Sequence, residues 1–411
     1  MLTLLLSLAV RVAILVPDFA SLDADPDGYR AIAENVVQNH SVARSRAGVL
    51  TPTAYRPPLY PTVLASIAWD GQLRPLAVAV LHVLLGAATV FGVLLLAANW
   101  KLGRWSYLAA ALVAVDPILL KQSTVVMTET LAAFLCVMAL LAITRYFDRA
   151  NLRHAAIVGL SLGVCTLCRP TFIVWSVMVI LLMLCRREKS RWMEAAVSSA
   201  VVIAALAPWA IRNQIQFGKP IFLTTHGGYT LWLGNNPEFI AHLRGSEKAA
   251  WKPQAFMIDW QVLCRWNDWN EVEIDQEAYA RAVGACRADP AGCFLAAAYR
   301  LSRLWGVAPQ AIASPEPAAQ RMQRLLVSIW YGALLLAAVV WLIALANSSC
   351  TPAWSSALLA CLAFSLVHLA YWCDLRMRAP LAPILCLLAA WGLSALFRWR
   401  RRSAGENVEA N

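Results

Sequence analysis

The stretch LAVAVLHVLLGAATVFGVLLLAA, residues 76–98, decides the fold class. It is longer than the roughly 20 apolar residues with which a helix crosses a bilayer, and it contains no Asp, Glu, Lys or Arg. The whole chain of 411 residues is 60% hydrophobic and 14% charged, with a mean hydropathy of +0.58. An ordinary water-soluble domain needs more charge on its solvated faces. The sequence therefore predicts an all-α polytopic membrane protein.

Apolar runs of this kind recur along the chain and predict about ten transmembrane helices. Several are shorter than roughly 17 residues, so their ends are defined only to within several positions. The first run has no charged start and no small-residue cleavage site, which favours a retained helix over a signal peptide. The runs lie at residues 2–16, 76–98, 107–120, 125–142, 155–167, 172–184, 195–209, 325–345, 353–371 and 383–397.

The short loops between these runs indicate the orientation. Alternate loops read NWKLGRW, RYFDRANLRH and CRREKSRW, and the tail begins FRWRRRS. Cytoplasmic loops carry the excess of Lys and Arg, so these loops and both termini are expected in the cytoplasm, in a multi-pass protein of the cytoplasmic (inner) membrane. The net charge of +11 is then a signal of topology, and no nucleic-acid partner is expected.

On this topology the two longest connections face outward. We expect an N-terminal membrane region at residues 1–210, whose first external loop is 17–75, and an external helical cap at 211–324. C-terminal transmembrane helices follow at 325–400, and a cytoplasmic tail at 401–411. Within the cap, RWNDWNEVEIDQEAYARAV has the pattern of an exposed helix entered from a tryptophan-rich loop.

Acidic residues crowd the exit of the first span in SLDADPDGYRAIAENVVQN. One reading is structural, because Asp25 before Pro26 has the pattern of a helix N-cap followed by proline at the first helical position. A cap needs only one carboxylate, however, and Asp23 and Asp27 stand beside it. Asp25 and Asp27 are therefore also candidate catalytic groups.

A further acid, Glu129, lies near the outer end of a span in LLKQSTVVMTETLAAFL. A carboxylate in an apolar run is costly, so such a group is a functional candidate by default. The alternative is a structural ion pair with Lys121 or with an arginine.

Arginines also gather at the outward ends of the spans, against the orientation rule. Their planar fork and permanent charge suit phosphate, whereas a purely structural role is contact with lipid headgroups. In TAYRPPLYP, residues 53–61, the prolines stiffen the backbone and hold Arg56 at the headgroup level. The set comprises Arg56, Arg169, Arg212, Arg376 and Arg378.

Carboxylates and arginines together at a membrane boundary suit sugar transfer from a lipid-linked phosphate. The phosphate leaves as an anion, so it needs cations, and a hydroxyl or amine acceptor gains from a carboxylate base. Residue types and spacing alone indicate only that the protein acts on anionic lipids at the outer leaflet.

Several segments, in order, resemble the GT-C superfamily of membrane glycosyltransferases. They are DADPDGYRAIAENV, YRPPLYPTVLA, MTETLAAFL, LCRPTF, PWAIRNQIQFGKPIFLTTHGGYTLWLGNNPEF and HLAYWCDLRMRAPLAPILCLLAAWGL. The sequence looks most similar to the bacterial members of the protein O-mannosyltransferase and lipid A aminoarabinose transferase type. The resemblance implies juxtamembrane helices in the first external loop, a polyprenyl-phosphate sugar donor, and a lipid, glycan or protein acceptor.

The resemblance also implies roles for individual residues. The acidic residue of the first external loop matches Asp25 best, with Asp27 next, and the acid after the third span matches Glu129. The terminal RxR-x-P pattern falls on Arg376, Arg378 and Pro380, with Met377 where an aromatic residue is common. Candidate substrate-binding residues are Tyr29, Arg56, Tyr60, Lys121, Arg169, Arg376 and Arg378.

The cap adds aromatic residues and cysteines. Its tryptophans suit interfacial anchoring or stacking on sugars; they are Trp232, Trp251, Trp260, Trp266 and Trp269. Cys286 can form a disulfide with Cys293, with Cys264 as a rival partner. His226 beside two glycines has the pattern of a turn residue. No His/Cys cluster has zinc spacing, and isolated acids leave a divalent metal possible but predict no metal site.

Two other classes of protein remain as alternatives. A secondary transporter or flippase of an anionic or lipid-linked solute would show internal repeats and charges near the midplane. No repeat is visible, and the charged candidates cluster at one face. A non-catalytic assembly factor would keep the same shape without activity.

Overall fold

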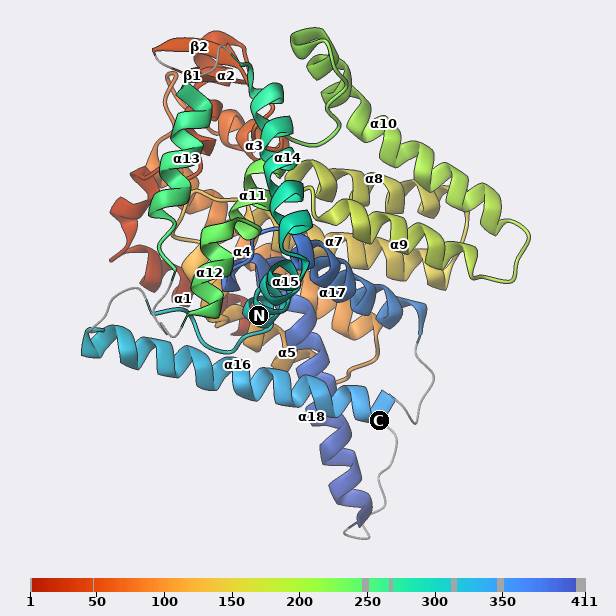
Figure 1. Cartoon of the computed structure of the whole chain (residues 1–411). Helices are drawn as coiled ribbons and strands as arrows, with labels where there is room; N and C mark the ends of the chain where they lie inside the picture. The colour runs from red at the N-terminus through yellow and green to blue at the C-terminus, as the bar shows by residue number, and fades with distance from the viewer. Residues whose placement is uncertain are drawn as a thin grey trace.

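The computed structural model describes residues 2–46, 48–245, 251–265, 269–311, 316–345 and 351–403. The predicted all-helical multi-pass fold is confirmed (Figure 1). Six helices in the described ranges are long and apolar enough to cross a membrane: α4 (Pro75–Asn99), α7 (Glu129–Asp148), α10 (Arg191–Phe217), α16 (Ala318–Leu345), α17 (Pro352–Ala370) and α18 (Ala382–Ser403). Shorter apolar helices accompany them: α1 (Leu2–Leu15), α5 (Trp105–Ala114), α8 (Leu152–Cys168) and α9 (Phe172–Leu184).

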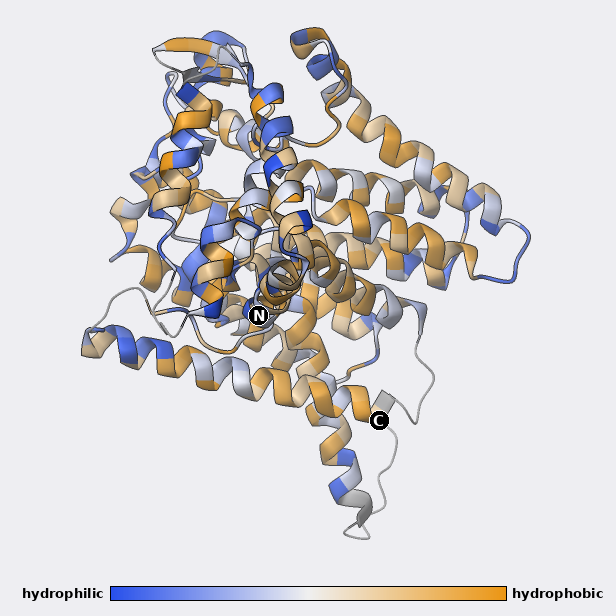
Figure 2. Ribbon diagram, viewed as in Figure 1, coloured by the Kyte–Doolittle hydropathy of each residue, from blue (hydrophilic) through white to orange (hydrophobic). Residues whose placement is uncertain are grey.

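The apolar side chains of these helices lie on both their inner and outer faces. Figure 2 shows hydrophobic residues around α8, α9 and α10, and large apolar side chains such as Leu160, Leu181 and Ile203 are exposed. Exposed apolar surface of this extent is typical of helices in contact with lipid. Inside, the buried core is continuous through the membrane helices.

The run at residues 107–120, expected as one span, is broken. Helix α5 ends at Ala114, and a short helix α6 (Pro117–Gln122) begins after Asp116. The Asp116 carboxylate accepts the backbone N–H groups of Ile118 and Leu119 at 3.1 and 3.0 Å, and Pro117 occupies the first helical position. An aspartate cap followed by proline starts a new helix, which is why the apolar run does not stay continuous.

The first connection folds into short elements. It contains η1 (Phe19–Asp23), α2 (Tyr29–Asn39), a hairpin of β1 (Ala43–Arg46) and β2 (Val49–Pro52), and α3 (Leu59–Ser66). The strands pair antiparallel, with Ala43 opposite Pro52. The juxtamembrane helices are as expected, whereas the hairpin is an addition to the predicted all-α fold.

In the described part of the cap, five helices pack around their own small cores. They are α11 (Gly227–Gly234), α12 (Pro237–Arg244), α13 (Gln254–Arg265), α14 (Glu271–Ala288) and α15 (Pro290–Leu304). Helix α14 begins with a capping box, in which Asn270 and Glu273 satisfy each other's backbone N–H groups. It is only partly exposed, because one face of the helix is buried among α11 and α13.

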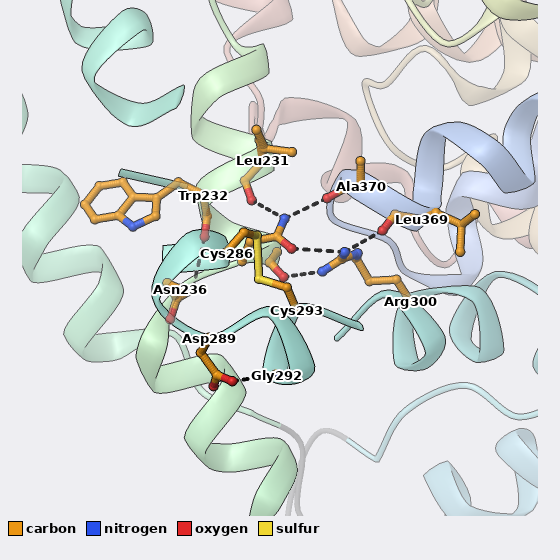
Figure 3. Close-up of a disulfide and its surroundings, with 12 residues drawn as sticks. Leu231, Trp232, Asn236, Cys286, Asp289, Gly292, Cys293, Arg300, Leu369 and Ala370 are labelled. Atoms are coloured by element: carbon orange, nitrogen blue, oxygen red, sulfur yellow. Dashed lines mark hydrogen bonds between the residues drawn. A yellow bond between two sulfur atoms is a disulfide. The ribbon is translucent and has the colours of Figure 1, made fainter. Parts of the chain in front are cut away.

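Two of the expectations for the cap have a structural outcome. Cys286 is bonded to Cys293, so Cys264 is not the partner (Figure 3). Trp232 and Trp251 pack within the cap and Trp260 lies partly buried beside them, whereas Trp266 lies outside the described residues. Residues 404–411 of the predicted tail also lie outside the described ranges.

Candidate active site

A cavity of about 640 Å³ lies between the membrane helices, the first connection and the cap. Segments from five parts of the chain line it: residues 26–57, 127–129, 168–174, 223–279 and 367–377. The structure brings six of the candidate residues together in this lining: Asp27, Tyr29, Arg56, Glu129, Arg169 and Arg376.

Asp27 and Arg56 form an ion pair on the first-connection side of the cavity. The Arg56 Nη2 atom lies 2.9 Å from Asp27 Oδ1, and Arg56 Nε donates to the Asp27 backbone carbonyl at 2.8 Å. The guanidinium also lies over the rings of Tyr29 and Tyr55. Burial lowers the pKa of Arg56, but Tyr29, Asp27 and Tyr55 outweigh it and raise the pKa above its ordinary value. Arg56 therefore stays charged and holds the Asp27 carboxylate at the cavity.

Glu129 and Arg169 form a second, deeper pair. Arg169 Nη1 lies 3.1 Å from Glu129 Oε1, and Glu129 is 1% exposed. Glu129 is the first residue of α7, where the helix dipole favours a negative charge. Its other carboxylate oxygen is buried and has no hydrogen-bond partner. The arginine alternative proposed for Glu129 is thus the observed pair, and Lys121 is not its partner.

Two arginines of the cavity direct N–H groups at methionine sulfur. Arg169 Nη2 donates to Met377 Sδ, and Arg376 Nη1 donates to Met127 Sδ, each at 2.9 Å. Arg376 Nε also donates to Asp374 at 3.1 Å. A thioether is a weak acceptor, whereas a phosphate oxygen is a strong one for a guanidinium. Arg169 and Arg376 therefore retain donor capacity for an anionic ligand.

Asp25 is close in sequence but does not line the cavity. Its two carboxylate oxygens accept the backbone N–H groups of Arg30 and Ala31 at 3.1 and 2.9 Å, in the first turn of α2. The N-cap position itself is taken by Gly28, which has a positive φ of 77°. The Asp25 side chain therefore caps the helix as the structural interpretation predicted, although the helix begins at Tyr29, three residues later than Pro26.

Lys121 and Tyr60 also lie outside the cavity lining. Lys121 pairs with Asp18 at 2.8 Å and is more than half exposed. Tyr60 is buried below Tyr29, with its ring edge-on to Tyr29 and its hydroxyl 2.9 Å from His82 Nε2. Tyr60 thus supports the cavity wall from behind.

Arg378 is fully buried behind the cavity. It donates to the carbonyls of Leu304 and Gly306 at 3.1 and 3.0 Å, and its guanidinium lies 4.2 Å from the centre of the Tyr331 ring. It thereby fastens the segment η2 (Leu375–Leu381) to the end of α15. In this position Arg378 supports Arg376 and does not reach a ligand in the cavity.

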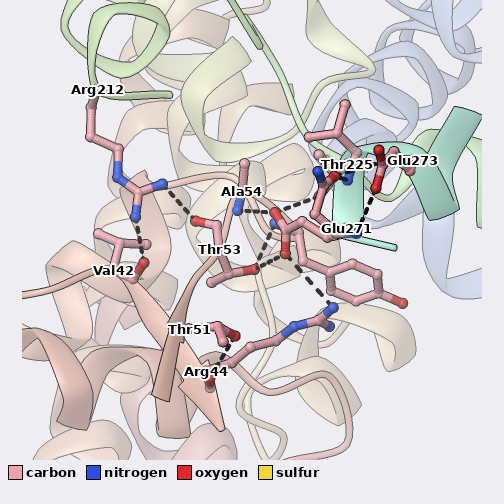
Figure 4. Close-up of polar contacts among 12 residues, drawn as sticks. Val42, Arg44, Thr51, Thr53, Ala54, Arg212, Thr225, Glu271 and Glu273 are labelled. Atoms are coloured by element: carbon pink, nitrogen blue, oxygen red, sulfur yellow. Dashed lines mark hydrogen bonds and ion pairs between the residues drawn. The ribbon is translucent and has the colours of Figure 1, made fainter. Parts of the chain in front are cut away.

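A buried carboxylate of the cap holds the first connection in place (Figure 4). Glu271 accepts the hydroxyls of Thr53 and Thr225 at 2.8 and 2.9 Å and the backbone N–H of Ala54. Arg44 lies 3.7 Å away and supplies an opposite charge. These contacts fix the residues directly before Tyr55 and Arg56, a linkage that sequence reasoning missed.

Arg212, another candidate from the sequence, supports the same loop from the end of α10. It donates to the backbone carbonyls of Thr53 and Val42 at 2.9 and 2.6 Å (Figure 4). It belongs to the scaffold of the loop and is absent from the cavity lining.

The opposite wall is positioned by a second buried arginine (Figure 3). Arg300 of α15 donates to Asn235 Oδ1 at 3.1 Å and to the carbonyls of Gly234 and Leu369. Asn235 in turn donates to the Ala370 carbonyl at 2.8 Å. The end of α17 is thus bound to the cap. The cavity residues Tyr371 and Trp372 come directly after this point.

The cavity also has an aromatic wall, of which sequence reasoning had named only Trp260 as a residue suited to stacking on sugars. We use this name for His226, Tyr229, Trp260, Tyr279 and Tyr371, which all line it. The available signal was the glycine pair in HGGYTLW. A Cβ atom on Gly227 would collide with the Tyr279 hydroxyl, and one on Gly228 with the Asp275 carbonyl. The glycines allow α11 to pack closely on α14. His226, expected as a turn residue, stands at the N-cap position of α11 and lines the cavity.

The contact between α11 and α14 is expected to make stability depend on pH. Burial raises the pKa of Asp275 to about 6, although the 2.7 Å hydrogen bond from Gly228 N–H opposes this and Glu271 adds to it. Because the folded state binds this proton more tightly, stability falls as pH rises from the unfolded value of 3.8 to about 6. Asp275→Asn keeps an acceptor for Gly228. It should raise the melting temperature above that of the wild type by more at pH 7 than at pH 4. If the melting temperatures of the two proteins in detergent changed with pH by the same amount, this prediction would be contradicted.

The two carboxylates of the cavity are each paired with an arginine rather than with each other. Asp27 and Glu129 each already hold an arginine within about 3 Å. In the described ranges, no group of three His, Cys, Asp or Glu side chains is arranged to hold a metal ion. A metal cation at either acid would have to displace the arginine or lie next to its positive charge. We therefore derive no step that uses a metal.

Part of the chain is similar in sequence to a known family, and the whole chain is similar in fold to solved structures. Residues 56–211 match the dolichyl-phosphate-mannose-protein mannosyltransferase family, and the matched range includes Arg56, Glu129 and Arg169. The archaeal oligosaccharyltransferase AglB from Archaeoglobus fulgidus, in complex with an inhibitory peptide and a dolichol-phosphate, superposes with a TM-score of 0.57 at 14% identity. The alignment covers 100% of this chain and 52% of AglB. The chain has the fold of the GT-C membrane glycosyltransferases.

Two further solved structures also match. The apo form of the Archaeoglobus fulgidus oligosaccharyltransferase gives a TM-score of 0.56 at 15% identity, and covers 100% of this chain and 52% of its own. ArnT from Cupriavidus metallidurans bound to undecaprenyl phosphate gives 0.44 at 15% identity, over 94% and 78% of the two chains, a score too low to assign a fold. None of the curated proteins matches significantly. The chain spans about half the length of these oligosaccharyltransferases.

Proposed function

We propose that this GT-C protein transfers a sugar from a polyprenyl-phosphate donor to an acceptor at the outer face of the cytoplasmic membrane. One observation carries the proposal: a single cavity holds the Asp27 carboxylate together with Arg169 and Arg376. Each of these arginines directs one N–H group at a methionine sulfur, which is a weak acceptor. A base and a cationic pocket for a leaving phosphate are the two requirements of this reaction.

In the proposed reaction Asp27 is the general base. It takes the proton of the acceptor hydroxyl or amine as the acceptor atom bonds to the anomeric carbon of the sugar. The bond from that carbon to the phosphate oxygen breaks, and its electron pair leaves with the phosphate. Arg169 and Arg376 stabilise the anion, and Glu129 orients Arg169 through their 3.1 Å contact. Attack opposite the leaving group inverts the anomeric carbon.

The proposed orientation rests on the loop charges. The basic loops lie at the opposite ends of the helices from the first connection and the cap, which carry the cavity. A lipid-linked donor suits this position, because its chain can stay in the bilayer while the phosphate reaches the arginines. Support for the class of donor comes from AglB, which has dolichol-phosphate in its structure.

The test is a mass comparison of envelope lipids, glycans and proteins from cells with the gene, without it, and with Asp27→Asn. We expect one class of molecule to lose the mass of one sugar in the latter two strains, while the lipid-linked donor accumulates. Unchanged masses, with movement of the lipid across reconstituted vesicles, would instead support a transporter.

Chelators are expected to leave the activity intact, because the two carboxylates of the cavity, Asp27 and Glu129, are already paired with arginines. Transfer by the purified protein in EDTA should stay within about twofold of transfer with added Mg²⁺ or Mn²⁺. Loss of activity in EDTA that added metal restores would contradict the arginine-based mechanism.

A further inference from the structure

The cavity divides into a charged side and an uncharged side. All its charged lining residues, Asp27, Arg56, Glu129, Arg169 and Arg376, come from the first connection and the membrane helices or their ends. The aromatic wall and its neighbours from the cap contribute none. Burial, together with Arg56 and Arg44, holds the pKa of His226 well below its ordinary value, so this imidazole is neutral at physiological pH. The residues of the aromatic wall therefore offer rings and hydroxyls and carry no charge of their own, and the nearest cations, Arg56 and Arg44, lie beside Tyr55 at the His226 end of the wall.

The rings of the wall support one another, so the surface is rigid. His226 stacks on Tyr229 with ring centres 5.0 Å apart, and Tyr229 meets the edge of Trp260 at 4.7 Å. Behind them, Phe256 contacts Tyr229 at 5.6 Å and is itself buried in the cap core. Mutual packing of this kind fixes ring orientations before a ligand arrives, which lowers the entropy cost of binding.

The wall also carries polar groups with unused hydrogen-bonding capacity. The hydroxyls of Tyr279 and Tyr371 lie 3.3 Å apart and bond to each other. The Tyr229 hydroxyl meets only the sulfur of Met257, at 3.7 Å, and His226 Nδ1 is buried without a partner. Each hydroxyl both donates and accepts, which matches the hydroxyls of a sugar.

We propose that the aromatic wall binds the ring of a neutral pyranose, a proposal that rests on the function proposed above. The C–H face of a pyranose packs on aromatic rings, and its hydroxyls pair with tyrosine hydroxyls. A uronic acid would place its carboxylate where the wall offers no cation. An amino sugar would place its ammonium where the wall offers no carboxylate. The ring is either the sugar of the donor or a sugar of a glycan acceptor.

The first test measures binding of small glycosides to the full-length protein in nanodiscs by saturation-transfer NMR. The probes are methyl pyranosides of a neutral hexose, a hexuronic acid and an amino sugar. We expect the neutral glycoside to bind best. Trp260→Leu should weaken it about tenfold, and Trp260→Phe, which keeps an aromatic face, by less than about threefold.

A second variant covers the case in which Trp260→Leu does not fold. Tyr279→Phe keeps the ring and removes only a hydroxyl, and we expect it to weaken the neutral glycoside several-fold. Preference for a charged glycoside, or equal binding by wild type, Trp260→Leu and Tyr279→Phe in folded samples, would overturn the proposal.

Two donor lipids identify the source of the sugar. If the wall holds the donor's sugar, a polyprenyl-phosphate sugar displaces the glycoside and polyprenyl phosphate alone does not. If the wall holds an acceptor sugar, the glycoside binds alongside either lipid. Binding of polyprenyl phosphate that Arg376→Ala abolishes, with no glycoside bound at the wall, would refute this inference while the proposed function stands.

Discussion

Replacing Asp27 with Asn is expected to lower sugar transfer by about 10²- to 10⁴-fold, the usual contribution of a general base. The Asn oxygen still accepts from Arg56, so the loop keeps its shape, but the side chain no longer takes a proton. Binding of the donor should be nearly unchanged, because Arg169 and Arg376, which we propose bind its phosphate, are intact. The measurement is the initial rate and the donor affinity of the purified full-length protein, with its melting curve as the check on folding.

The matched control is Asp25→Asn, two residues away. Its carboxylate accepts two backbone N–H groups of α2, and an amide retains only one acceptor oxygen. We expect a loss of about 1 kcal/mol in stability and little change in the rate of transfer by the folded protein. The reverse result, with transfer lost in Asp25→Asn and kept in Asp27→Asn, would make Asp25 the base and refute the cavity assignment.

The sequence was informative about the membrane helices because one physical demand dominates them. A bilayer requires long apolar runs whatever the tertiary contacts, and helix α9 occupies residues 172–184, as predicted. The break at Asp116 was missed because a hydropathy pattern averages over a single polar residue, although Asp-Pro is a recognised helix start.

The candidate site was predictable only in part, for a different reason. Charged residues at span ends stand out against an apolar background, which identified Glu129 and Arg169. Their pairing with each other depends on how α7 and α8 pack, and the sequence does not encode that locally. Arg376 and Arg378 have the same local pattern, yet one faces the cavity and the other is buried against Tyr331.

Residues of the cap were hardest to assign, since their role depends on contacts across the chain. Glu271 lies in an ordinary acidic helix start, EVE, where either acid suits the helix dipole. Only the structure shows that Glu271 is 7% exposed and bound to Thr53, 218 residues away, while Glu273 is an exposed member of a capping box.

Replacing Glu271 with Ala is expected to lower the free energy of unfolding by about 3–5 kcal/mol, because it leaves buried partners unsatisfied. The hydroxyls of Thr53 and Thr225 and the N–H of Ala54 lose their acceptor, and Arg44 loses its opposite charge. The loop that carries Arg56 is then released, so the folded protein should also lose most of its transfer activity. Glu271→Gln, which keeps one acceptor oxygen, should retain an intermediate activity.

Glu273→Gln is the control. Glu273 lies in the same helical turn as Glu271, and its replacement removes the same negative charge. It alters only the exposed capping box, and we expect a cost of about 1 kcal/mol or less and unchanged transfer. Rates are measured well below each melting temperature, so that stability and positioning are separated. A purely structural role for Glu271 would lower the melting temperature and leave the rate of the folded fraction unchanged. A positioning role lowers that rate and follows the order wild type, Gln, Ala, because each step removes acceptors from the backbone that leads into Arg56.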